Sequence, residues 1–139
     1  MGREDVEGGM EGIMTTDQWQ VLIVEDEYDS AQVVSKILTH HGVEVFVARD
    51  GQECLDMLGS LIPTAIVMDL AMPEKDGWST LLEIRANPET AHIPVVAVTA
   101  YHSASVAQDA IAAGFDAYFS KPVDPNSFVE SLAEVIDRH

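Results

Sequence analysis

Short apolar runs alternate along the chain with longer segments in which apolar residues recur every three or four positions. Three continuous apolar runs, one alternating run rich in valine and one short aromatic run predict five β-strands, at 21–24, 65–68, 95–98, 43–48 and 117–119 respectively. A continuous apolar run is typical of a strand covered on both faces of a parallel sheet, whereas the alternating run indicates a more peripheral strand.

Each predicted strand is followed by a segment with helical spacing. We expect these helices at 28–41, 51–58, 78–85, 103–113 and 125–136. Gly42 and Gly114 stand just after two of them, where a glycine commonly ends a helix, and Asp124 is favoured as the first cap of the last one. This repetition predicts an α/β fold, a doubly wound sheet of five parallel strands with helices on both faces.

The first 18 residues differ from the rest of the chain. They are rich in glycine and acidic residues and contain few apolar side chains. Such a segment buries too little surface to offset the entropy lost on ordering. The sequence therefore predicts a disordered arm at 1–18 and a folded domain at 19–139.

The charge composition of the chain excludes some classes of binding partner. Apolar residues make up 47% and charged residues 22% of the chain, which is ordinary for a globular domain. The balance of charge is not ordinary, because 7 Lys and Arg stand against 24 Asp and Glu, a formal net charge of −17. So few cations cannot form the basic surface that nucleic acids or anionic membranes require. We therefore expect neither as a partner.

Other features indicate the compartment. Cys54 is the single cysteine of the chain, so it cannot form an intramolecular disulfide. No apolar run approaches the roughly 20 residues of a membrane span, and the first residues lack the plan of a signal peptide. These features predict a soluble, cytoplasmic protein.

Polar residues follow the predicted strands in an informative order. The acidic segment 25–27 follows the first strand, Asp69 ends the third, Thr99 ends the fourth, and Lys121 follows the fifth. In an open α/β sheet, ligands bind outside the carboxyl ends of the strands. Each residue alone is most simply a helix cap or a solvated charge. Their joint placement instead predicts one functional site.

This set of side chains points to phosphoryl chemistry. Clustered carboxylates repel one another unless a cation lies between them, and Mg²⁺ prefers carboxylate ligands together with water. One carboxylate can then attack a phosphoryl group and form an aspartyl phosphate. The ammonium of Lys121 and the hydroxyl of Thr99 would serve as donors to the phosphoryl oxygens.

Four motifs at these strand ends carry a resemblance to a known family. They are Glu25-Asp26-Glu27, Asp69 with Pro73 and Gly77, Thr99-Ala100, and Lys121-Pro122. In this order and spacing, the chain from about 19 to 137 resembles the receiver domains of two-component response regulators. The resemblance implies a flavodoxin-like sheet with strand order 2-1-3-4-5. It also implies a signalling domain, not an enzyme beyond its own phosphorylation and dephosphorylation.

The family pattern assigns roles to the matching positions. Asp69 corresponds to the phosphoacceptor, which receives its phosphoryl group from a histidine kinase or a histidine phosphotransfer protein. Glu25, Asp26 and Asp69, with the backbone carbonyl of Ala71, correspond to the ligands of Mg²⁺.

The remaining positions bind the phosphoryl group and transmit the signal. Lys121, Thr99 and Ala100 correspond to residues around the phosphoryl group, and Tyr118 to an aromatic side chain that turns inward on activation. The Lys121–Pro122 bond is expected to be cis. The resemblance places the partner surface, for a downstream protein or a second copy, on the fourth helix, fifth strand and fifth helix.

Two departures from the pattern concern chemistry. Glu25 replaces the more usual aspartate, and its extra methylene suits contact with the metal through water. Ala71 offers no polar group to position an attacking water, and Tyr101 would shield the phosphoryl group. This pair favours a longer-lived phosphoryl state.

Alternative functions remain open at this point. The chain is expected either to act alone or to be a receiver excised from a hybrid histidine kinase or larger regulator. A Mg²⁺-dependent aspartyl-phosphate phosphatase also uses an aspartate at a strand end, but its second aspartate would fall at Ala71. A receiver used only for docking would not need its acidic residues, Thr99 and Lys121.

Overall fold

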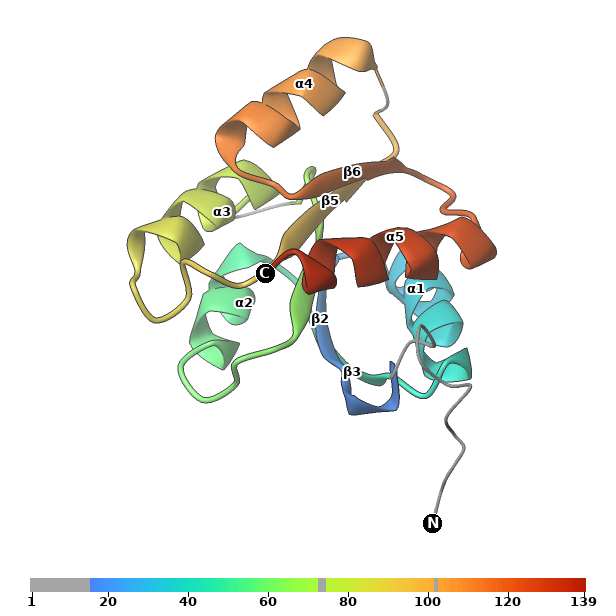
Figure 1. Cartoon of the computed structure of the whole chain (residues 1–139). Coiled ribbons are helices and arrows are strands. Elements are labelled where there is room, and N and C mark those ends of the chain that lie inside the picture. Colours follow the sequence, from blue (N-terminus) through green and yellow to red (C-terminus); the bar gives the residue numbers. More distant parts are fainter. Residues whose placement is uncertain (1–15, 73–74, 102) are drawn as a thin grey trace.

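The computed structural model describes residues 16–72, 75–101 and 103–139, and the strands among them form one parallel sheet (Figure 1). The strands are β2 (Gln20–Val24), β3 (Glu44–Ala48), β4 (Ala65–Asp69), β5 (Val95–Thr99) and β6 (Ala117–Ser120). Their order across the sheet is β3-β2-β4-β5-β6. Counted along the chain this is 2-1-3-4-5, so the expected flavodoxin-like order is confirmed.

Five helices cover the two faces of the sheet (Figure 1). They are α1 (Tyr28–His40), α2 (Gly51–Met57), α3 (Gly77–Ala86), α4 (Ala104–Ala113) and α5 (Pro125–Asp137). Each begins and ends within a residue or two of the position predicted from the spacing of apolar residues. Among the described residues, no helix combines the length and apolar character needed to cross a membrane.

Alternate residues of each strand supply two separate cores. Val21 and Ile23 of β2 face α1 and α5, whereas Leu22 and Val24 face α2 and α3. All five residues of β4 and of β5 are buried, as expected of central parallel strands. The sheet is thus packed on both faces, so the ends of its strands are rigid and hold the residues that follow them in fixed positions.

The boundary of the expected N-terminal arm was wrong at its last three residues. Thr16–Gln18 form a short 3₁₀ helix, η2, and Thr16 is buried. The Thr16 hydroxyl donates to the carbonyl of His41 at the end of α1, and the N–H of Trp19 donates to the carbonyl of Thr16 at 3.0 Å. These two contacts tie Thr16 to the end of α1 and to the start of the sheet, and thereby hold the segment. Residues 1–15 lie outside the described residues.

Side-chain caps start four of the helices. Asp50, Asp76, Ser103 and Asp124 each accept a hydrogen bond from the N–H three residues further on, at 2.8–3.1 Å. The Asp124 cap was expected, and the hydrogen bonds that Asp124 accepts from the backbone and the side chain of Ser127 lower its pKa. Three of these caps, Asp76, Ser103 and Asp124, lie at the ends of the loops that follow β4, β5 and β6. They therefore fix those loops near the carboxyl ends of the strands.

A close approach of backbone to backbone fixes the loop after β4. The N–H of Gly77 donates to the carbonyl of Leu70 at 3.2 Å. A Cβ on Gly77 would lie 2.5 Å from the carbonyl oxygen of Asp69 and 3.0 Å from the Cα of Leu70. Because both neighbours are backbone atoms, they cannot move aside without displacing the end of β4.

We therefore expect Gly77→Ala to lower the free energy of unfolding by about 1–3 kcal/mol, measured by urea denaturation. Gly59→Ala is the matched control, because a Cβ there would meet only the carbonyl oxygen of Asp56, at 3.2 Å. Its effect should stay within about 0.5 kcal/mol. Equal losses in the two variants would contradict this account of Gly77.

Candidate functional site

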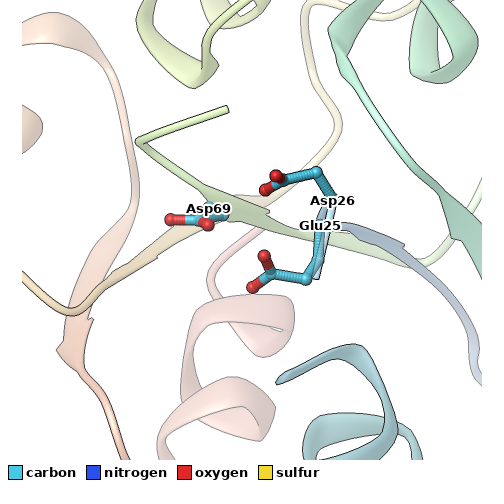
Figure 2. A group of neighbouring side chains, drawn as sticks. All are labelled: Glu25, Asp26 and Asp69. Carbon is cyan, nitrogen blue, oxygen red and sulfur yellow. The ribbon is translucent and has the colours of Figure 1, made fainter. Parts of the chain in front are cut away.

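Three carboxylates meet where two neighbouring strands end (Figure 2). β2 and β4 are paired in parallel with Val24 opposite Met68, so Glu25 and Asp69 leave the sheet at the same level. Asp26 follows directly. One oxygen from each of the three carboxylates lies within 4.8 Å of the others. The sheet register brings together the acidic residues that the sequence predicted.

Local hydrogen bonds orient two of these carboxylates. Glu25 accepts from the N–H of Glu27 at 3.2 Å, and Asp69 accepts from the N–H of Ala71 at 3.2 Å. Both side chains are buried, whereas Asp26 is exposed. Glu27 is the N-cap residue of α1, and its side chain makes no cap hydrogen bond, so neither Glu25 nor Asp26 is used as a cap.

Lys121 supplies the cation that faces this cluster. Its Nζ lies 2.5 Å from Oε1 of Glu25 and 3.4 Å from Oδ2 of Asp69. Burial alone would lower the pKa of Lys121, but the hydrogen bond that it donates to Glu25 and the charges of both carboxylates outweigh this effect and raise the pKa. Lys121 is therefore a cation at neutral pH.

Glu25 has the opposite balance. Its burial raises the pKa of the carboxyl group, and the neighbouring Asp69 raises it further, while the bonds from Lys121 and the Glu27 N–H only partly lower it. The charged form of Glu25 is therefore destabilised in the folded protein. A second cation near the cluster would relieve this cost.

Thr99 and Lys121 are tied together through the backbone. Thr99 ends β5 with only 1% of its surface exposed, and its hydroxyl accepts from the N–H of Tyr101 at 3.1 Å. The N–H of Lys121 donates to the carbonyl of Thr99 at 3.0 Å. The expected cis peptide bond between Lys121 and Pro122 is present.

A hollow of about 230 Å³ opens at this edge of the sheet. Its walls bring together residues from the loops after β2, β4, β5 and β6, namely Asp26, Glu27, Asp69, Ala71, Ala100, Tyr101 and Lys121. Tyr101 stands at the mouth with 73% of its surface exposed. Ala71 and Ala100 are small, which leaves space directly beside Asp69.

The acidic cluster at this hollow suits Mg²⁺; Asp26 and Asp69 line the hollow, whereas Glu25 does not. Three carboxylates face a single ammonium among the described residues, so the site carries excess negative charge. All the candidate ligands are hard oxygen atoms, and the hollow leaves room for the waters that Mg²⁺ retains. Cys54, by contrast, lies in the core, where burial raises the pKa of its thiol to about 12.

Most of the predicted residues meet, but three features were not anticipated. Tyr118 lies half-buried on β6 against the α2–α4 core and does not line the hollow. Lys121 pairs most closely with Glu25, although the sequence predicted a role at the phosphoryl group. Glu27 also lines the hollow. Its position directly after Glu25 and Asp26 could have indicated this from the sequence.

Comparisons with known proteins agree with this geometry. The family model "Response regulator receiver domain" matches residues 21–133. The polar-differentiation response regulator DivK of Brucella anthropi is 32% identical over 112 residues, covering 81% of this chain and 91% of that protein. The hybrid signal transduction histidine kinase I of Dictyostelium discoideum is 32% identical over 121 residues, 81% of this chain but 7% of the kinase.

Solved structures show the same fold. A response regulator from Chloroflexus aurantiacus superimposes with a TM-score of 0.82 and 28% identity, over 86% of this chain and 98% of that one. The receiver domain of sensor histidine kinase PA1611 from Pseudomonas aeruginosa, described with magnesium coordinated in its active-site cleft, has a TM-score of 0.79 and 28% identity over 86% and 98%. The chain belongs to the receiver-domain family of two-component response regulators.

Proposed function

We propose that Asp69 accepts a phosphoryl group, with Mg²⁺ held beside it by Asp26, Asp69, the Ala71 carbonyl and, through water, Glu25. The observation that carries this proposal is the position of Asp69, a buried carboxylate within 4.8 Å of two others and 3.4 Å from the Lys121 ammonium. The donor is a histidine kinase or a histidine phosphotransfer protein, the class of partner that the family uses.

The residues around Asp69 have different roles in the transfer of the phosphoryl group. The N–H of Ala71 holds Oδ1, which leaves Oδ2, on the side of Lys121, as the nucleophile. Attack on phosphorus forms the Asp69–phosphoryl bond and breaks the bond from phosphorus to the donor nitrogen, which keeps the electron pair. Mg²⁺, when bound, offsets the charge on the phosphoryl oxygens. Lys121 and Thr99 donate to the same oxygens, and small Ala100 leaves room for them.

Two neighbours bear on the lifetime of the product. The methyl side chain of Ala71 lines the hollow without offering a group to orient water, and the Tyr101 ring stands at its mouth. Both features support slow hydrolysis of the aspartyl phosphate. The chain then acts as a phosphoacceptor that catalyses only its own phosphorylation and dephosphorylation.

The signal leaves the site through Thr99. Its hydroxyl holds the N–H of Tyr101, at the start of the loop into α4. When Thr99 turns toward the phosphoryl oxygens it releases this N–H, and half-buried Tyr118 fills the space behind it. The surface of α4, β6 and α5 changes as a result, and a downstream protein or a second copy of the chain reads it.

The comparisons support two contexts for this function. DivK has nearly the same length as the matched region, whereas the matched region is a small part of the hybrid kinase. A receiver in either context would use the same residues.

Incubation with Mg²⁺ and a small phosphoramidate donor should add one phosphoryl group to the intact protein, measured by mass spectrometry. Asp69→Asn should abolish the addition, because the amide is not a nucleophile. Asp29→Asn, an acidic residue in the first turn of α1, is the control and should be labelled normally. Undiminished labelling of Asp69→Asn would refute the assignment.

Mg²⁺ should raise the melting temperature of the wild-type protein. At ten times the Kd, binding to the folded state alone contributes about 1.4 kcal/mol. Asp26→Asn should reduce this gain, and without divalent ions it should stabilise the protein by roughly 1 kcal/mol, since it removes a like charge from the cluster. Glu134→Gln, on the exposed face of α5, should do neither. A full Mg²⁺ effect in Asp26→Asn would contradict the site.

Thr99→Ala should separate phosphorylation from its consequence. Asp69 should still be labelled, because the nucleophile and Lys121 remain. The response of the Tyr118 ring to beryllofluoride, followed by NMR, should be lost, because the hydroxyl that moves is gone. An unchanged Tyr118 response in Thr99→Ala would show that the signal takes another route.

A further inference from the structure

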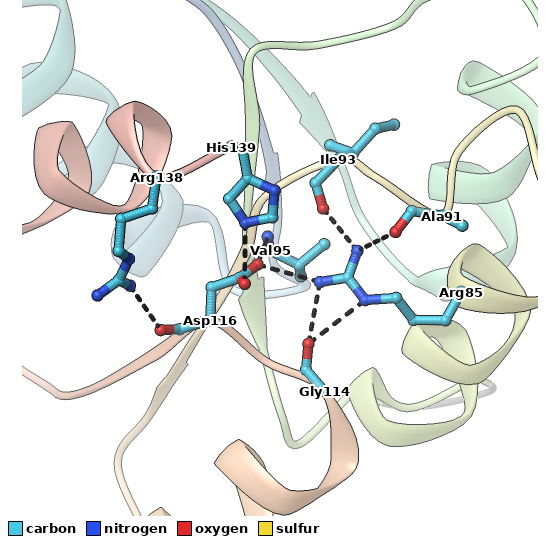
Figure 3. Close-up of polar contacts among 8 residues, drawn as sticks. All are labelled: Arg85, Ala91, Ile93, Val95, Gly114, Asp116, Arg138 and His139. Carbon is cyan, nitrogen blue, oxygen red and sulfur yellow. Dashed lines mark hydrogen bonds and ion pairs between the residues drawn. The ribbon is translucent and has the colours of Figure 1, made fainter.

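A single arginine joins several elements at the amino ends of β5 and β6 (Figure 3). Arg85, in the last turn of α3, directs its guanidinium at three backbone carbonyls. Nη1 donates to Ala91 at 2.9 Å and to Ile93 at 2.6 Å, and Nη2 and Nε donate to Gly114 at 2.9 and 3.3 Å. Nη2 also lies 3.0 Å from Oδ2 of Asp116. We call these five residues the Arg85–Asp116 junction.

Asp116 extends the junction to β5 and to the end of α5. Its Oδ2 accepts from the N–H of Val95 at 2.9 Å, and its own N–H donates to the Val95 carbonyl at 2.8 Å. Its Oδ1 lies 3.0 Å from Nε2 of His139, and its carbonyl accepts from Arg138 at 3.3 Å. The chain directly after α4 is therefore held from three directions.

The two ends of α4 are attached very differently. Of the residues of α4, all of which the structure describes, Ala110 alone is buried. At the C-terminal end, Gly114 has a φ of 116° and its carbonyl accepts hydrogen bonds from Arg85. The buried ring of Phe115 packs edge-to-face on Trp78, with 5.8 Å between the ring centroids. At the N-terminal end, Ser103, Ala104 and Ser105 are exposed.

The loosely attached end is the one joined to the functional site. Thr99, at the carboxyl end of β5, holds the N–H of Tyr101 two residues before the Ser103 cap. Val95, at the other end of the same strand, is bonded to Asp116. The helix thus spans the sheet from the site to the junction, a separation of about 13 Å along β5.

We propose that the Arg85–Asp116 junction is a hinge anchor, which holds the C-terminal end of α4 in place and confines the response to phosphorylation to its N-terminal half. This inference rests on the proposed function, because the movement begins at Thr99. Displacing the Gly114 end would remove the guanidinium from Gly114 and Asp116 and leave partly buried polar groups unpaired. In the N-terminal half, Val106 and Ala107 are partly buried and the other three residues are exposed. Among the residues that the structure describes, no comparable set of side-chain hydrogen bonds holds that half.

The geometry of the guanidinium is what makes the anchor. Arginine presents five N–H donors in one rigid plane, and here four of its bonds reach carbonyls on both sides of the fork. The single ammonium of lysine cannot reach Ala91, Gly114 and Asp116 together. Arg85→Lys therefore keeps the charge but loses the connection between α3 and the end of α4.

Hydrogen exchange of backbone amides, with and without Mg²⁺ and beryllofluoride, tests the hinge. In the wild-type protein, beryllofluoride should change exchange at 107–109 and leave 113–115 unchanged. In Arg85→Lys, exchange at 113–115 should rise on the order of tenfold in the free protein. More tellingly, beryllofluoride should now change exchange at 113–115 as well, an effect that loss of stability alone does not produce.

Two further variants complete the experiment. Asp116→Asn keeps the shape of the side chain but removes its charge, and should give the same spread of the response to a smaller degree. Arg49→Lys is the matched control, because Arg49 is exposed and outside the junction, and should behave as the wild-type protein.

The outcomes separate the two proposals. An equal beryllofluoride response along the whole of α4 in the wild-type protein would overturn the hinge while leaving Asp69 as the acceptor. A response in Arg85→Lys that stays confined to 107–109 would overturn it as well. Failure of beryllofluoride to bind at all would instead refute the proposed function, and the hinge with it.

Discussion

Repulsion among three carboxylates is the constraint around which the active edge of this protein is built. Glu25 and Asp69 are buried and point into the same space as Asp26, within 4.8 Å of one another. Such a cluster is costly in any folded chain unless cations offset it. Lys121, on the loop after β6, supplies one cation at 2.5 Å from Glu25, and the oxygen-rich hollow beside it suits a second, divalent one.

The fold tolerates this unfavourable cluster because other parts of the structure stabilise it. Two apolar cores grip β4 and β5 from both faces, and helix caps close the loops that carry the charged residues. The opposite edge of the sheet has the reverse character, since Arg85 and Asp116 satisfy one another and their backbone neighbours. One edge is thus electrostatically strained and responsive, and the other is satisfied and fixed, with α4 running between them.

Local patterns predicted the features that depend on neighbouring residues. The buried strands β2, β4 and β5 are continuous apolar runs, so their positions and the acidic residues at their ends followed directly. The fold class also predicted that residues at different strand ends would meet, but it did not predict which particular side chains and carbonyls far apart in the chain would be bonded to each other. The order of Thr16–Gln18 comes from His41, and the Lys121–Glu25 pair joins residues 96 positions apart. The acceptors of Arg85 are mainly backbone carbonyls. Because every residue has a carbonyl, no sequence pattern marks these acceptors.

The central claim is that Asp69 accepts the phosphoryl group and that Lys121 then donates to the phosphoryl oxygens. A crystal structure of the protein with Mg²⁺ and beryllofluoride bound would test it most directly, through one distance. The account predicts that Nζ of Lys121 leaves Oε1 of Glu25 and moves to hydrogen-bonding distance, about 3 Å, from a fluorine of the group on Asp69. Beryllofluoride bound to Asp69 with Lys121 still paired to Glu25 would contradict it.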